Sequence, residues 1–264
     1  MSILGSLGDV ARKPPELRPR EDAGKTPHRD LRTAVLWIIG SAATCALLVY
    51  ATAALVDRPV AFWVHEHLGD ERFGWFAATY KGRMFRLGPF SLLAGPAEAL
   101  QPLAVLAFAI LATSAVGGWR PGIHGRNVLA LCLSIFVSIA IDGVAKDVFG
   151  RTWPESWLGD NPSWIRDGVF GFFPFHGGMG WGSFPSGHTT SITAAATILW
   201  VLWPELRCVW GALVATVIIG LIGGNYHFVS DIIGGLYLGV SIGLSIVALM
   251  LARNDRQASS ERSH

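Results

Sequence analysis

The sequence predicts an all-α membrane protein: a bundle of six transmembrane helices with an interfacial helical segment between the first and second spans. Composition gives the first reason, because 51% of the 264 residues are hydrophobic and only 15% are charged, whereas ordinary soluble domains contain roughly 25% charged residues. The distribution of apolar residues gives the second reason, because they gather in runs whose lengths are close to that of a spanning helix, which needs about 20 residues.

Each span is expected where such a run occurs. Residues 33–55 carry no charged side chain, so they give the first span. Further apolar runs predict the other five spans at 102–119, 127–146, 188–204, 208–226 and 232–252. Six crossings would place both ends of the chain on the same side of the membrane.

The long connection at 57–101 is expected to lie outside the membrane. Aromatic and charged residues alternate through its first part, a pattern typical of helices at the depth of the lipid headgroups. Residues 87–100 are apolar but include Pro89 and Pro96, so we expect them to dip into the membrane without crossing it. A crossing here would give seven spans and would require the two sides to be reassigned.

The membrane domain is expected at 31–253, with a flexible polar tail at 1–30 and a second polar tail at 254–264. Lys and Arg are abundant in the tails and in the short connections on the same side, which favours a cytoplasmic location for both ends. The protein is therefore expected in a membrane of the bacterial inner-membrane type, in contact with membrane lipids. The sequence leaves the oligomeric state open.

Composition also argues against several classes of function. The net charge is only +2 and no basic stripe is interleaved with aromatic residues, so no nucleic-acid partner is expected. The three cysteines, an odd number without regular spacing, indicate neither a disulfide framework nor a zinc site. His65-Glu66-His67 lacks the spacing of a helical zinc pair, and no carboxylate cluster indicates magnesium. We expect neither a metal nor a cofactor.

Three polar clusters stand at the outer ends of predicted spans. In chain order they are Lys146 with Arg151, the run Pro185-Ser186-Gly187-His188, and His227 with Asp231. Ionisable residues beside a bilayer are costly and mark a functional site by default. Because all three clusters fall on the outer side of the predicted map, we expect them to meet in one pocket.

The start of the fourth span suits a phosphate group. A helix start exposes backbone N–H groups and the positive end of the helix dipole, which bind anions, and Gly187 lets the backbone approach closely. We therefore expect Ser186 and Gly187 to bind phosphate, with His188 within reach of a leaving oxygen as a general acid. The competing interpretation is that Ser186 is an ordinary helix cap.

His227 and Asp231 are four residues apart, which places them on one face of a helix. A carboxylate bound to one ring nitrogen would leave the other nitrogen free as nucleophile or base; the alternative is a buried pair that only neutralises two polar groups. Lys146 and Arg151 are cations of the kind that stabilise a transferring phosphoryl group. Lys146 also lies four residues after Asp142, where an intrahelical ion pair would account for it.

These motifs resemble those of the type 2 phosphatidic acid phosphatase family of integral-membrane lipid phosphatases. That family has a lysine-to-arginine-proline motif, a Pro-Ser-Gly-His motif and a serine-arginine stretch leading to His-x-x-x-Asp. The resemblance implies metal-independent hydrolysis of a phosphorylated lipid, in which His227 attacks phosphorus, Asp231 holds His227 and His188 protonates the leaving group. Phosphate binding is implied for Lys146, Ser186 and Gly187.

The chain departs from the family pattern at two positions. Trp153 stands where the first motif normally has its second cation, and Leu221 stands where the third motif has its arginine. Loss of a bidentate arginine removes geometry as well as charge. Arg151, two residues before Trp153, is the candidate to reach into the pocket and substitute, which makes it a predicted phosphate ligand.

The sequence supports three hypotheses about function. The first is hydrolysis of a lipid phosphate monoester or diphosphate through a phosphohistidine, at the outward-facing side of the membrane. The second is a lipid phosphotransferase that uses the same two histidines and aspartate but gives the phosphoryl group to an alcohol. The third is a catalytically silent protein that binds or carries a lipid phosphate. None of the three identifies the lipid.

Overall fold

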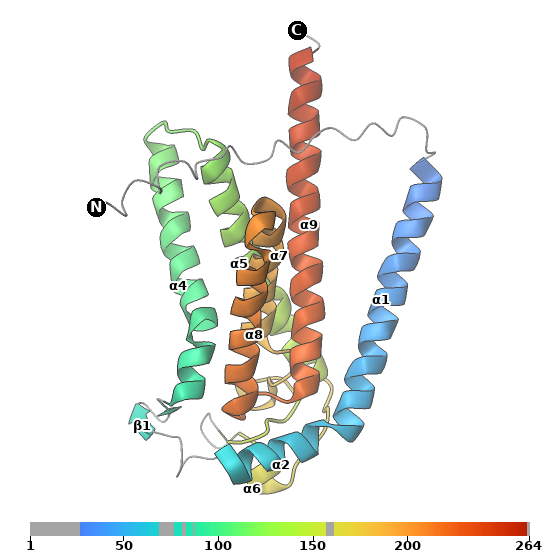
Figure 1. Ribbon diagram of the computed structural model, residues 1–264, viewed down its shortest axis with the longest axis vertical. Helices are drawn as coiled ribbons and strands as arrows, with labels where there is room; N and C mark the ends of the chain where they lie inside the picture. Colours follow the sequence, from blue (N-terminus) through green and yellow to red (C-terminus); the bar gives the residue numbers. More distant parts are fainter. Residues whose placement is uncertain (1–26, 69–76, 81–82, 87, 157–160, 263–264) are drawn as a thin grey trace, which may run out of the picture.

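A computed structural model of the chain describes residues 27–68, 77–80, 83–86, 88–156 and 161–262. The predicted amino-terminal tail lies outside this description up to residue 26. Long helices form the membrane domain, and a shorter helix runs across one end of the bundle (Figure 1). The predicted helical fold class is confirmed for the membrane domain.

Six helices build the bundle: α1 (Pro27–Leu55), α4 (Pro89–Val116), α5 (Ile123–Phe149), α7 (Gly187–Leu202), α8 (Arg207–Gly223) and α9 (Val229–Arg262). Among the described residues, five helices are long and apolar enough to cross a membrane, and α7 is not one of them. Its 16 residues extend about 24 Å, less than the roughly 30 Å of the hydrocarbon core. Helix α7 packs against α5, α8 and α9, so the predicted fourth span crosses the bundle as a short helix enclosed by longer ones.

The second span begins earlier than predicted. Helix α4 is continuous from Pro89 and contains Pro96 and Pro102, so the prediction that residues 87–100 dip into the membrane without crossing was wrong. Proline usually breaks a helix in water, but neighbouring helices allow it in membrane helices. Here α8 supplies that support: a Cβ on Gly220 would lie 2.6 Å from the carbonyl oxygen of Phe90, so the two backbones are in direct contact.

The connection between α1 and α4 is only partly helical. Helix α2 (Asp57–Leu68) lies across the end of the bundle (Figure 1), with Ala61 and Val64 buried and Phe62 and Trp63 exposed. This is the arrangement expected of an interfacial helix. After it, an antiparallel hairpin of β1 (Ala77–Tyr80) and β2 (Arg83–Arg86) replaces the helix that was predicted there. Residues 69–76 lie outside the description.

Helices α7 and α9 cross at a stripe of glycines. Gly235, Gly239 and Gly243 recur every four residues on α9, and a Cβ on Gly239 would lie 2.6 Å from the carbonyl oxygen of Thr190. Small residues at this spacing let membrane helices approach closely. The contact fixes the start of α7 beside the start of α9. Helix α9 continues to Arg262, so most of the predicted carboxy-terminal tail is helical.

Candidate active site

The three polar clusters meet at the end of the bundle that α2 covers. The end of α5, the start of α7 and the turn before α9 all lie there (Figure 1). The rings of His188 and His227 face each other edge to face with their centroids 6.4 Å apart. The connection from α5 to α7 includes two short helical turns, α6 (Trp164–Asp167) and η1 (Met179–Trp181). Side chains predicted to act together from distant segments are thus neighbours.

Ser186 forms the start of α7. Its Oγ accepts hydrogen bonds from the backbone N–H and the hydroxyl of Thr189, at 3.4 and 3.0 Å, so the cap considered in the sequence is present. Its own N–H donates to the backbone carbonyl of Asp231 at 3.1 Å, which ties the start of α7 to the start of α9. Gly187 and His188 are half-buried. A helix start of this kind offers its first N–H groups to an anion.

The four-residue spacing of His227 and Asp231 predicts that they share a helix, but this prediction was wrong. His227 lies in the turn before α9, whose first residue is Val229, and Asp231 folds back over that turn. The Asp231 Oδ2 accepts from the backbone N–H of Phe228 at 2.9 Å and from the Ser183 hydroxyl at 2.6 Å. A carboxylate that bonds back to the residue before a helix is half of a capping box.

The contact between His227 and Asp231 is close but long for a hydrogen bond. The His227 Nδ1 lies 3.5 Å from the Asp231 Oδ2, beyond the about 3.2 Å limit of a good N–H···O bond. Catalytic contacts of this kind often tighten when substrate binds. The Trp153 ring packs against His227, with centroids 5.2 Å apart. Nδ1 therefore faces the carboxylate, which leaves Nε2 for chemistry.

Arg151 is fully buried among acidic and aromatic groups. Its Nη2 lies 2.6 Å from the Asp57 Oδ2, and its Nε lies 3.3 Å from the Asp231 Oδ1. The guanidinium also lies over the Phe172 ring, 4.2 Å from the centroid. Arg151 and His227 thus lie against different oxygens of the Asp231 carboxylate, Oδ1 and Oδ2 respectively. These contacts account for the charge of Arg151 without a phosphate, and its role as a phosphate ligand stays a prediction.

Asp57 is the site-linked residue that the sequence analysis missed. It begins α2, and its carboxylate accepts from both the backbone N–H and the hydroxyl of Ser230 at the start of α9. Burial raises the pKa of the Asp57 carboxyl, and the Arg151 guanidinium and the Ser230 hydrogen bonds oppose that rise. The only signal in the sequence was an acidic residue placed directly after an apolar span.

A second polar network, also missed, holds α2 to the same end. The Glu155 Oε1 lies 3.0 Å from the His65 Nδ1 and accepts from the Asn225 side-chain amide at 2.9 Å. The same amide donates to the carbonyl of Ala61 in α2 at 3.1 Å. Helix α2 and the loop after α5 are therefore joined twice: Asp57 links them to the start of α9, and Glu155 links them to the turn between α8 and α9.

Neither the Leu221 position nor the surroundings of Gly187 adds a net positive charge to the site. Leu221 is 1% exposed and packs in the core between α4, α7, α8 and α9, so that position supplies no cation. Near Gly187 the structure adds an anion: a Cβ there would lie 2.7 Å from the Asp142 Oδ2. The same oxygen pairs with the Lys146 Nζ at 2.8 Å, so the intrahelical ion pair is present. Within the described ranges, no three His, Cys, Asp or Glu side chains are grouped to hold a metal ion.

Comparison with known proteins places these motifs in a family. The sequence profile of the PAP2 superfamily matches residues 127–255. The lipid A 1-phosphatases of Rhizobium johnstonii and Rhizobium etli are each 28% identical to this chain over 120 residues. That segment is 45% of this chain and 47% and 50% of those proteins, so the match spans about half the length of these curated relatives.

Among solved structures, the crystal structure of a transmembrane PAP2-type phosphatidylglycerolphosphate phosphatase from Bacillus subtilis is similar, with a TM-score of 0.48 and 18% sequence identity. The similarity covers 81% of this chain and 96% of that one. The matched segment 127–255 contains all three polar clusters. The protein is an integral membrane protein with several helical spans, and its segment 127–255 belongs to the PAP2 superfamily.

Proposed function

We propose that this protein is a membrane phosphatase that hydrolyses a phosphate monoester or diphosphate of a lipid through a phosphohistidine, at the outer face of the membrane. The observation that carries the proposal is the pairing of His188 and His227, with ring centroids 6.4 Å apart and Asp231 behind the second ring. The name of the Rhizobium relatives, lipid A 1-phosphatase, supports a phosphorylated lipid as the substrate class. The Lys and Arg distribution supports cytoplasmic ends and an outward-facing site.

The chemistry takes two steps. Asp231 holds Nδ1 of His227, and Nε2 attacks phosphorus while the bond from phosphorus to the leaving oxygen breaks and that oxygen takes a proton from His188. In the second step His188 removes a proton from water, the water oxygen bonds to phosphorus, and the N–P bond breaks to release phosphate. Lys146 and the first N–H groups of α7 stabilise the charge on the equatorial oxygens.

The test of this function is phosphate release by purified protein in detergent, supplied with lipid phosphates of several headgroups. We expect release that vanadate inhibits and that a chelator leaves unchanged, because no step uses a metal. Free phosphate that is replaced by a new ester when an alcohol is added would favour the phosphotransferase. Bound lipid phosphate without turnover would contradict catalysis and leave the silent binder.

Asp142 makes the proposed phosphate pocket less positive, which gives a separate prediction. Asp142→Asn removes a negative charge next to Gly187 and frees Lys146 from its ion pair. Two charges 4 Å apart interact by about 1–4 kcal/mol between water and a protein surface, so we expect inorganic phosphate to inhibit about tenfold more strongly. The inhibition constant in the phosphate-release assay measures this effect.

Asp147→Asn is the matched control, because Asp147 is exposed one turn further along α5 and loses the same charge. Its inhibition constant is expected to equal that of the wild type. An unchanged or weaker inhibition in Asp142→Asn would remove Asp142 from the phosphate pocket.

A further inference from the structure

An apolar cavity of about 650 Å³ lies between α1, α5, α9 and the loop before α7, which contributes Phe170, Phe172 and Phe184 to its lining. We propose that this cavity binds one hydrocarbon chain of the lipid substrate and that α1 forms its outer wall. The inference rests on the proposed function and adds to it a place for the part of the substrate that does not react. The volume lies within the roughly 300–1,000 Å³ of ordinary ligand sites.

The cavity adjoins the proposed active site. Phe184 and Pro185 line it and directly precede Ser186 in the chain. On α9, Gly234 lines it, less than one turn after Asp231. The Phe184 ring closes the end nearest the site: it meets the rings of Phe149 and Phe172 edge to face, with centroids 4.9 and 5.3 Å apart. The segments that form the phosphate pocket therefore also form the cavity wall.

The shape and chemistry of the cavity suit an alkyl chain. On α1 the cavity wall runs from Ala42 to Ala54, a length of about 18 Å along the helix axis. This length is more than half the thickness of the hydrocarbon core, which is about 30 Å. None of the described residues that line it is charged. The Ala54 end adjoins α2 and the proposed site, while the Ala42 end lies deeper in the membrane. A chain attached to a bound phosphate would therefore follow α1 inward.

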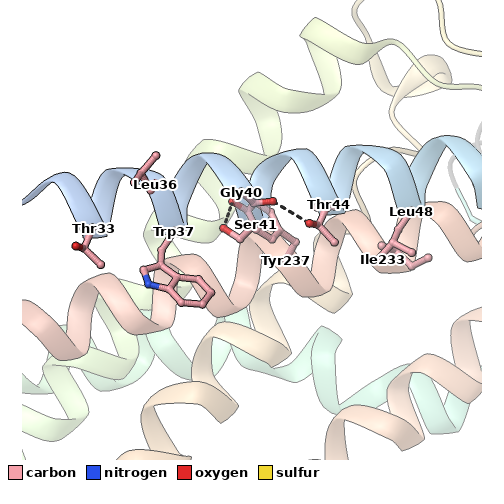
Figure 2. Close-up of a pocket in the computed structure, with 10 residues that line it drawn as sticks. Thr33, Leu36, Trp37, Gly40, Ser41, Thr44, Leu48, Ile233 and Tyr237 are labelled. Atoms are coloured by element: carbon pink, nitrogen blue, oxygen red, sulfur yellow. Dashed lines mark hydrogen bonds between the residues drawn. The ribbon is translucent and has the colours of Figure 1, made fainter.

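A second groove on the other side of the contact between α1 and α9 provides a comparison (Figure 2). It measures about 760 Å³ and is lined by one face of α1 together with Ile233 and Tyr237 of α9. Figure 2 shows this α1 face, from Thr33 to Leu48, lying along α9. Its described lining includes nothing from α5 or from the loop before α7. The first cavity, in contrast, is lined by Phe184 and Pro185, which directly precede Ser186 and Gly187, so we assign the substrate chain to the first cavity.

The experiment fills the cavity at two depths. Ala53→Trp and Ala46→Trp both place a large ring on the cavity wall of α1, and seven residues separate them by about 10 Å. The substrates are monoalkyl phosphates of increasing chain length in detergent. Both variants are expected to hydrolyse the shortest phosphate with wild-type kcat/KM. KM should rise about tenfold for long chains, because methylenes excluded from the cavity lose their burial, and the rise should begin at a shorter chain in Ala53→Trp.

Two controls use the same helix. Leu47→Trp adds a ring at a neighbouring position that is 67% exposed and lines neither space, and Thr44→Trp fills the second groove. Both should keep the wild-type dependence on chain length. Wild-type profiles in both cavity variants would overturn the inference, as would an equal loss for short and long chains. If wild-type protein releases no phosphate from any substrate, the proposed function itself fails; His227-dependent release with unaltered chain preference would defeat only the chain site.

Discussion

His227→Ala is expected to abolish phosphate release, lowering kcat by at least about 10⁴-fold, the scale on which loss of a catalytic nucleophile or its base acts in other enzymes. Without the Nε2 of His227, no phosphohistidine can form. The loss should not come from misfolding. Asp231 keeps its hydrogen bonds from Ser183 and from the backbone of Phe228, so the substitution leaves no buried carboxylate without a partner. Rapid quenching with a labelled phosphate ester should trap the phosphoenzyme in the wild type and not in the variant.

Two comparison variants separate the roles within the pair of histidines. His188→Ala should lose more activity on an alkyl phosphate than on an aryl phosphate whose leaving group needs no proton, because only the general acid is missing. Trp153→Ala removes the ring that packs on His227 and should alter kcat without abolishing it. Equal activity of His227→Ala and the wild type would remove the nucleophile assignment.

Hydropathy located most of the membrane helices because long apolar runs have few alternatives in a chain of this composition. It failed at α4, where Pro89 and Pro96 predict a broken segment. Whether a proline breaks a helix depends on what surrounds it. Here the close approach of α8 at Gly220 is a tertiary contact that the local sequence does not encode.

The convergence of the clusters could be predicted because helix ends on one side of a membrane are forced to the same depth. The partners of individual side chains could not. Arg151 and Asp57 are 94 positions apart, and neither lies in a periodic pattern that points to the other. Asp142 was interpreted only through its spacing to Lys146, and its approach to Gly187 depends on how α5 packs on α7. Spacing rules describe one helix; the site is built between helices.

Arg151→Met tests whether this arginine positions the catalytic pair or binds phosphate. The guanidinium pairs with two carboxylates that are both fully buried, Asp57 and Asp231. Breaking a buried pair from one side costs about 3–5 kcal/mol, because the remaining charge has no partner. We expect a loss of that size in the free energy of unfolding, measured by denaturation in detergent, together with a large fall in kcat as Asp231 is displaced from His227.

The double variant Arg151→Met with Asp57→Asn gives this prediction its sharpest form. Removing the Asp57 charge as well should restore part of the stability that Arg151→Met loses, so the two effects will be strongly non-additive. A phosphate ligand would behave differently. Its loss would raise KM and the inhibition constants of phosphate and vanadate while the unfolding curve stayed in place, and Asp57→Asn would rescue nothing. Coupling between the two substitutions would show that Arg151 and Asp57 act as one buried ion pair, which joins α2 to the loop after α5.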